Sequence, residues 1–290
     1  MQFTFQALGT TWWIEVFDDN PTSSLDILST DIEDFANVFE NRYSRFKEQS
    51  LVSTLNKERI LTAPEEDCFK IFSYAKQLYI RSNARFNVLV GHILEERGYD
   101  PTYSFAAKQG GNTLAGNPIS DLLVSRDEIS ITTGNVDFGG FGKGYLIDLL
   151  ATRLQETYGY KYFFINGGGD MYTTSRQEEP VEIILEHPTQ ANTGIYKTTL
   201  LNQGFAASSP FKRRWKTATG ETSHIVSETT VTQTANFIKA TKASTADAFA
   251  TTSLLMSPEE INQLAKTEQL GFAQFSPSTN QITGNKLFFG

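Results

Sequence analysis

The chain has 290 residues, of which 39% are hydrophobic, and carries a formal net charge of −8 at pH 7. This length allows a large buried core, whereas the acidic balance argues against general nucleic-acid binding, which relies on Lys and Arg to neutralise phosphates. No apolar run approaches the roughly 18 residues of a membrane span, and the single cysteine, Cys68, excludes an internal disulfide.

The N-terminal half predicts a mixture of strands and helices. Residues 3–17 alternate as a strand does, and Gly9 with Thr10 breaks them into a hairpin or bulge. Apolar residues at helical spacing predict one helix over 25–39, begun by Ser23 or Ser24, and another that Pro64 opens.

The C-terminal half predicts mostly strands. Short strands are expected near 121–125, 128–133, 161–166, 181–186, 195–201 and 234–240. A helix is predicted from Thr245, a second begins at the capping box of Ser257 and Pro258, and residues 271–289 predict a closing hairpin. Consecutive strands without intervening helices favour an α+β class over a doubly wound sheet.

Residues 243–252 (ASTADAFATT) place a carboxylate and a hydroxyl four positions apart in a small-residue helix. Asp247 and Thr251 therefore share one helix face. Such paired hard oxygens suit Mg²⁺ when phosphate oxygens and water complete the shell. On this stretch alone, the alternative is favoured: Thr245 caps the helix, Asp247 complements its dipole, and Thr251 is an ordinary polar residue.

Residues 136–148 (VDFGGFGKGYLID) form a glycine-rich turn between a predicted strand and a predicted helix. Such a turn lets backbone N–H groups approach a phosphate, and Lys143 adds a positive charge. The spacing matches neither a Walker A loop nor G-x-G-x-x-G. A tight turn with a surface lysine is the alternative interpretation.

Together these two segments resemble the ApbE family of FAD:protein FMN transferases. Residues 137–148 are similar to the family pattern D-L-G-G-I-A-K-G-Y-x-x-D, and residues 246–251 to A-D-A-x-x-T. Shorter similarities follow the family's order at residues 8–11 (LGTT), 43–56, 85–87 (RFN), 166–170 (NGGGD) and 224–225 (HI). Two departures stand out: Asn87 replaces an Asp, and Val226 begins a stretch that lacks the usual Asp-Pro-x-Thr-Gly.

The resemblance implies an α+β, T-fold-like arrangement of mixed sheets with flanking helices. It also implies one domain over residues 1–290, with FAD in a cleft between two intimate lobes. The implied Mg²⁺ ligands are Asp247, Thr251 and the backbone carbonyl of Gly140. The implied FAD-binding residues are Leu8, Phe46, Arg85, Phe86, Asn87, Asp137, Lys143 and Ile225.

The resemblance further implies Mg²⁺-dependent transfer of the FMN moiety of FAD to a Thr or Ser hydroxyl, with release of AMP. His224 is the candidate general base, and Asp247 acts through the metal. Two alternatives stay open: a Mg²⁺-dependent FAD pyrophosphatase that releases FMN and AMP, and a non-catalytic FAD-binding or storage protein.

The expected acceptor is a separate flavoprotein with a sequence like D-x-x-S/T-G-A-T, because this chain contains no such sequence. The first residues alternate as a strand and show no basic region, apolar region or lipobox cysteine. This pattern favours a cytoplasmic location.

Overall fold

The computed structural model describes residues 1–19, 22–100, 104, 106, 114–211, 214–217, 220–223, 226 and 231–290. The chain forms two compact units. Unit 1 comprises Met1–Val38, Phe141–Lys212 and Val231–Gly290, and unit 2 comprises Phe39–Gly140 and Arg213–Thr230.

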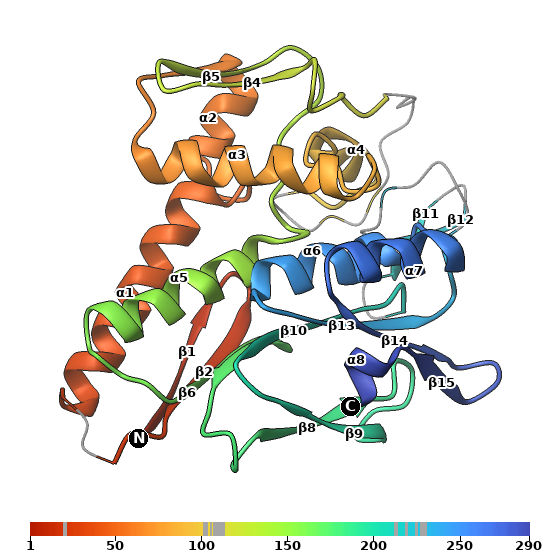
Figure 1. Cartoon of the computed structure of the whole chain (residues 1–290). Coiled ribbons are helices and arrows are strands. Elements are labelled where there is room, and N and C mark those ends of the chain that lie inside the picture. The colour runs from red at the N-terminus through yellow and green to blue at the C-terminus, as the bar shows by residue number, and fades with distance from the viewer. Residues whose placement is uncertain are drawn as a thin grey trace. The chain divides into compact units, whose positions relative to one another are not determined.

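Unit 1 is built on an eight-stranded sheet whose neighbouring strands are all antiparallel (Figure 1). The strands, in their order across the sheet, are β1 (Gln2–Ala7), β2 (Thr10–Val16), β6 (Phe163–Gly167), β7 (Asp170–Thr174), β10 (Gln203–Ser208), β13 (Ala235–Ala240), β14 (Gly271–Ser276) and β15 (Gln281–Gly284). This order places β7 and β10, which sequence analysis did not predict, in the middle of the sheet.

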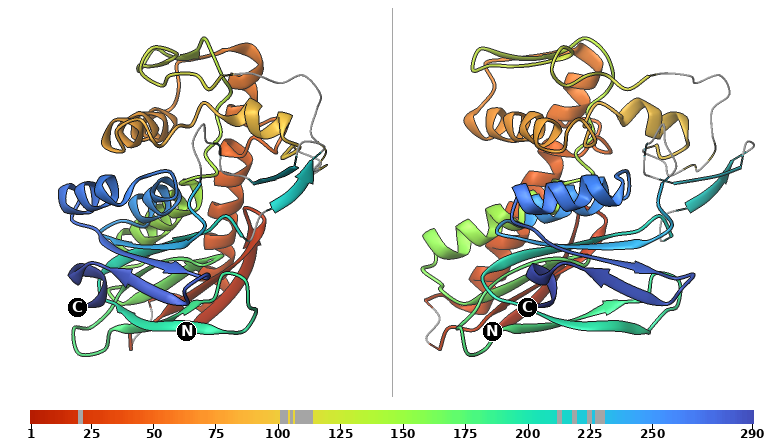
Figure 2. Two further views of the ribbon diagram at one scale, coloured as in Figure 1. Left: turned by 90° about the vertical axis from the view of Figure 1, so that its right-hand side faces the viewer. Right: turned by 45° about the vertical axis from the view of Figure 1, so that its right-hand side comes forward.

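Helices cover one face of this sheet, and a hairpin covers part of the other (Figures 1 and 2). The helices are α5 (Gly142–Glu156), α6 (Ala243–Ser253) and α7 (Pro258–Thr267). The opposite layer consists of β8 (Val181–Glu186), β9 (Gly194–Leu200) and the short α8 (Lys286–Phe289). Apolar side chains of that layer and of the sheet form a core of Ile183, Leu185, Leu200, Phe205, Ala235, Phe237, Ala273, Phe275 and Phe288.

Unit 2 combines helices with small sheets. Its helices are α2 (Leu51–Glu58), α3 (Glu66–Arg81) and α4 (Gly91–Glu96), and α1 (Leu25–Tyr43) runs into it from unit 1. A three-stranded sheet orders β3 (Ile60–Thr62), β5 (Glu128–Ile131) and β4 (Leu122–Val124), and β11 (Arg214–Thr217) pairs with β12 (Gly220–Ser223).

The α+β class is confirmed, with several differences in detail. The N-terminal hairpin and the capping box at Ser257 form as predicted. Helix α6 begins at Ala243, not at Thr245, so Thr245 lies inside the helix and does not cap it. The predicted closing hairpin is β14 with β15, after which the chain ends in α8. None of the helices in the described part of the chain combines the length and apolar character that crossing a bilayer requires.

Candidate functional site

Unit 1 gathers one lysine and two carboxylates at the start of α5. Lys143 Nζ lies 2.5 Å from Asp170 Oδ2 and 3.6 Å from Asp247 Oδ2. The side chains of Asp170 and Asp247 are only 5% and 7% exposed. The triad of Lys143, Asp170 and Asp247 therefore places two carboxyl groups and one ammonium group in a site shielded from water.

Three different elements bring these side chains together. Lys143 is the second residue of α5, directly after the glycine-rich loop, and Asp247 lies in the first half of α6. Asp170 begins β7 after a two-residue turn of Gly168 and Gly169, whose φ angles of 66° and 102° favour glycine. Asn166 Oδ1 accepts a 2.8 Å hydrogen bond from the Gly169 N–H and orders this turn.

The charge balance of the triad changes the acidity of Asp247. Removal from water, followed by the negative charge of Asp170, raises the pKa of Asp247 to about 7. Lys143 and a 3.0 Å hydrogen bond from the Gly144 N–H to Oδ2 act in the opposite direction. One lysine does not fully compensate two buried carboxylates, so the triad favours a further positive charge, either a proton on Asp247 or a bound cation.

The donor atoms around the triad fit Mg²⁺. Thr251 lies one helical turn beyond Asp247 on α6, and its hydroxyl donates to Ser208 Oγ at 3.3 Å. Among the residues that the structure describes, no three His, Cys, Asp or Glu side chains gather as a metal-binding group. The oxygens of the two carboxylates and, one helical turn along α6, of the Thr251 hydroxyl are of the hard type that Mg²⁺ prefers, and a magnesium shell would require phosphate and water oxygens as well.

Leu8 lies at the tip of the β1–β2 hairpin, in a strained conformation. Leu8 and Gly9 form the two-residue turn with φ angles of 48° and 68°. Positive φ is unfavourable for a bulky side chain, and such strain concentrates at functional sites. Close to this tip, Thr10 packs against Gly168, where an added Cβ would lie 2.5 Å from Thr10 Oγ1. The hairpin tip is thus fixed against the turn that precedes Asp170.

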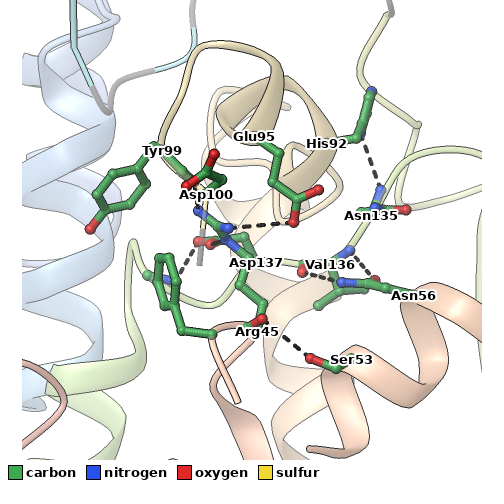
Figure 3. Close-up of polar contacts among 12 residues, drawn as sticks. Arg45, Ser53, Asn56, His92, Glu95, Tyr99, Asp100, Asn135, Val136 and Asp137 are labelled. Carbon is green, nitrogen blue, oxygen red and sulfur yellow. Dashed lines mark hydrogen bonds and ion pairs between the residues drawn. The ribbon is translucent and has the colours of Figure 1, made fainter. Parts of the chain in front are cut away.

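In unit 2, Arg45 is the centre of a buried polar cluster (Figure 3). Its Nε donates to Asp137 Oδ2, and its Nη2 donates to the carbonyl of Tyr99 at 2.7 Å. Glu95 Oε1 lies 3.5 Å from Nη1. The guanidinium is therefore paired with two carboxylates, which suits a buried charge.

Asp137 uses both of its carboxylate oxygens within the protein. Oδ2 accepts from Arg45, and Oδ1 accepts a 2.7 Å hydrogen bond from the Gly139 N–H. The next residue, Gly140, faces the ring of Phe86, where an added Cβ would lie 3.0 Å from a ring carbon. Asp137 and Phe86 therefore shape the glycine-rich loop, whatever ligand that loop binds.

Phe46, Arg85 and Asn87 also lie in unit 2, all partly buried. The guanidinium carbon of Arg45 lies 4.2 Å from the centroid of the Phe46 ring, which leaves the ring half-buried. Asn87 Nδ2 donates to the Gly116 carbonyl, and its Oδ1 accepts from the Leu89 N–H, both at 2.8 Å. Asn87 thus supports a loop through these two contacts. His224 and Ile225 lie outside the described residues, so their predicted roles stay predictions.

Comparison with known protein families shows the family to which the chain belongs. The model of the ApbE family matches residues 8–274, so the chain belongs to the ApbE family. No curated protein sequence matches the chain.

Solved structures share the fold at low sequence identity. The flavinyl transferase ApbE of Pseudomonas stutzeri, in its apo form, superposes with a TM-score of 0.83 and 18% identity, covering 99% of this chain and 95% of that one. The ApbE protein of Thermotoga maritima gives 0.83 and 18%, covering 99% and 97%. The flavin transferase ApbE of Vibrio cholerae gives 0.80 and 17%, also covering 99% and 97%. The predicted mixed-sheet, ApbE-like fold is therefore confirmed over nearly the whole chain.

Proposed function

We propose that this protein transfers the FMN moiety of FAD to a Thr or Ser hydroxyl of an acceptor flavoprotein, in a Mg²⁺-dependent reaction that releases AMP. Membership of the ApbE family supports flavin transfer in general. The observation that carries the metal dependence is the triad of Lys143, Asp170 and Asp247, with the Thr251 hydroxyl one turn away. A metal ion held by such a group of oxygens can stabilise the charge that develops on a phosphate in the transition state.

The reaction is a substitution at phosphorus. The acceptor oxygen forms a bond to the FMN-side phosphorus, and the anhydride bond to the AMP phosphate breaks. The hydroxyl proton passes to a base, for which His224 is the candidate, and AMP leaves with the electron pair of the broken bond. Two negative phosphates repel a nucleophile, so catalysis depends on charge neutralisation and positioning.

In this reaction, different residues of the chain have different roles. Asp247 and Thr251 hold Mg²⁺, which supplies charge neutralisation at the phosphates when bound. Lys143 offers its ammonium group to the same phosphates or to the two carboxylates. Arg45 and Asp137 order the glycine-rich loop, whose Gly140 carbonyl is a further candidate ligand.

The proposed FAD-binding residues are those that the resemblance to the family implies. Leu8 supplies an apolar contact from its strained hairpin tip, and the half-buried ring of Phe46 offers a stacking surface to a flavin or adenine ring. By resemblance to the family, the proposed set is completed by Arg85, Phe86, Asn87, Asp137 and Ile225, beside Lys143.

The test combines the protein with FAD, Mg²⁺ and a peptide or domain that carries a D-x-x-S/T-G-A-T-like sequence. Transfer predicts covalent flavin fluorescence on the acceptor in a denaturing gel, with an equal amount of AMP. An acceptor whose Thr or Ser is changed to Ala must stay unlabelled. Free FMN with AMP and no adduct would instead identify a pyrophosphatase, and intact FAD would identify a binding protein.

A further inference from the structure

In helices α5 and α6, a carboxylate from each helix accepts hydrogen bonds from the N-terminal turn of the other. The residues that precede them, Phe141 and Lys242, make no side-chain cap hydrogen bond. The first N–H groups of a helix need acceptors from elsewhere. In α5, the Gly144 N–H donates to Asp247 of α6 at 3.0 Å.

Asp148 of α5 makes the reciprocal contact with α6. Its Oδ1 accepts from the Ala243 N–H at 2.8 Å, and its Oδ2 accepts from the Ser244 N–H at 3.1 Å. The Ser244 hydroxyl also donates to Oδ2 in a short hydrogen bond. Asp148 therefore caps the helix that carries Asp247, just as Asp247 caps the helix that carries Asp148.

The two contacts together form a two-point connection, named here the α5–α6 clamp and consisting of Gly144, Asp148, Ala243, Ser244 and Asp247. On α5, Gly144 and Asp148 are four residues apart, and on α6 so are Ala243 and Asp247. Four residues correspond to about 6 Å along a helix axis. Because the two points lie a full turn apart, neither helix can slide or rotate without breaking one of them.

The clamp also depends on close backbone approach. A Cβ on Gly144 would lie 2.4 Å from the Ala243 carbonyl oxygen, and one on Gly204 of β10 would lie 2.5 Å from the Ala243 nitrogen. The first turn of α6 is therefore enclosed between α5 and the sheet. Asp148 is the only side chain among the described residues that accepts from both N–H groups of Ala243 and Ser244.

We propose that Asp148 is a positioning residue for the metal site: it fixes α6 against α5, so that Asp247 and Thr251 present their oxygens in the geometry that Mg²⁺ requires. This inference rests on the proposed function, in which those two side chains are metal ligands. Mg²⁺ demands near-ideal octahedral geometry at about 2.1 Å. The ligand atoms of such a site must be held within about 0.5 Å of their required positions. A supporting residue that is hydrogen-bonded to the ligand-bearing element can provide this precision.

The test compares three variants of the full chain by titration with Mn²⁺, followed by electron paramagnetic resonance, in the presence of FAD. In Asp148→Asn, an amide nitrogen replaces one carboxylate oxygen and cannot accept, so one N–H of α6 loses its partner. In Ser244→Ala, the hydroxyl bond to Asp148 is lost and the backbone N–H bond to it is kept. Asp31→Asn is the matched control, because it breaks the ion pair with Arg153 near the other end of α5.

We expect Asp148→Asn to raise the Kd for Mn²⁺ at least tenfold and Ser244→Ala to raise it about threefold, with FAD binding in the absence of metal unchanged in both. Asp31→Asn lowers the thermal midpoint and leaves the Kd unchanged. A Kd equal to that of the wild type in Asp148→Asn would overturn the inference, and Ser244→Ala decides in the same way if Asp148→Asn does not fold. Failure of the wild type itself to bind Mn²⁺ would instead refute the proposed metal site, and the inference with it.

Discussion

At the scale of single residues, the site is defined by a charge imbalance that the sequence alone does not reveal. Asp247 and Lys143 stand out because each belongs to a recognisable segment. Asp170 also lies in a segment that resembles the family, but its contact with Lys143 is made through the β6–β7 hairpin, 27 positions further along the chain, and local sequence does not predict it. Arg45 was missed for the same reason: its partner, Asp137, is 92 positions away.

The acidity of Asp247 predicts how pH controls metal binding. Because burial and Asp170 raise the pKa of Asp247 to about 7, its carboxylate must lose a proton before a cation binds at lower pH. We therefore expect Mg²⁺ with FAD to raise the thermal midpoint more at pH 8 than at pH 6, with affinity falling by up to about tenfold per pH unit below 7. An equal shift at both pH values would contradict the assignment.

In the metal-free protein, a rise in pH has the opposite effect: it decreases the contribution of Asp247 to stability. The folded pKa lies above the unfolded value, so the folded state binds more protons between about pH 4 and 7. The contribution of Asp247 to stability is thus greatest at low pH and decreases as the pH rises through this window.

A substitution at Leu8 should affect the stability of the protein and its binding of FAD in opposite directions. Asn adopts positive φ more readily than Leu, so Leu8→Asn should stabilise the protein by roughly 0.5–1 kcal/mol. The loss of the apolar side chain should at the same time weaken FAD binding several-fold, as isothermal titration calorimetry would measure. Ala63→Asn is the matched control, because Ala63 has a φ of 47° in an exposed turn of unit 2. Unchanged FAD affinity in Leu8→Asn would remove Leu8 from the site.

At the scale of elements, local signals predicted some structures well and long-range packing decided the rest. The N-terminal hairpin and the helix after Ser257 follow from alternation and capping, which are local. Strand β10 contains Gly and Ala residues with little intrinsic preference for a strand. Its small residues are explained by α6, which lies against Gly204. Helix α2 was missed although Ser50 caps it through the Ser53 N–H, a signal that the sequence did contain.

A substitution at Gly144 tests how closely helices α5 and α6 approach each other. In an ordinary helix, Gly→Ala stabilises by about 1 kcal/mol. Here the added methyl group would lie 2.4 Å from the Ala243 carbonyl oxygen, so we expect Gly144→Ala to destabilise the protein by about 2 kcal/mol in urea unfolding. Thr152→Ala, at an exposed position of α5, should stay within about 0.5 kcal/mol of the wild type. A stabilised Gly144→Ala would show that the two helices are further apart.

At the scale of the whole molecule, a buried lysine joins three elements of unit 1. Lys239 of β13 donates to Thr198 Oγ1 of β9 at 2.6 Å and to the Phe288 carbonyl of α8 at 2.8 Å. Its ammonium nitrogen also lies 4.7 Å from the centroid of the Phe288 ring. Lys239 thus connects the large sheet to the β8–β9 layer and to the C-terminal helix.

Burial lowers the pKa of Lys239 to about 8. Between pH 8 and about 10.5 the unfolded chain therefore binds more protons at this position, so stability from this group rises with pH. We expect the difference in unfolding free energy between the wild type and Lys239→Met to change in favour of the wild type by on the order of 2 kcal/mol across this range. A difference that is constant with pH would show that Lys239 titrates normally.

The most direct test of the metal-assisted transfer is the Mg²⁺ dependence of AMP release from FAD, measured with acceptor present for the wild type and for Asp247→Asn. Removing one carboxylate from the triad takes away the negative charge that favours the cation, and a catalytic metal contributes several kcal/mol. We predict a loss of at least about a hundredfold in rate, with FAD still bound and the thermal midpoint retained. Wild-type rates in Asp247→Asn, or wild-type AMP release that is unaffected by removal of divalent cations, would contradict the account.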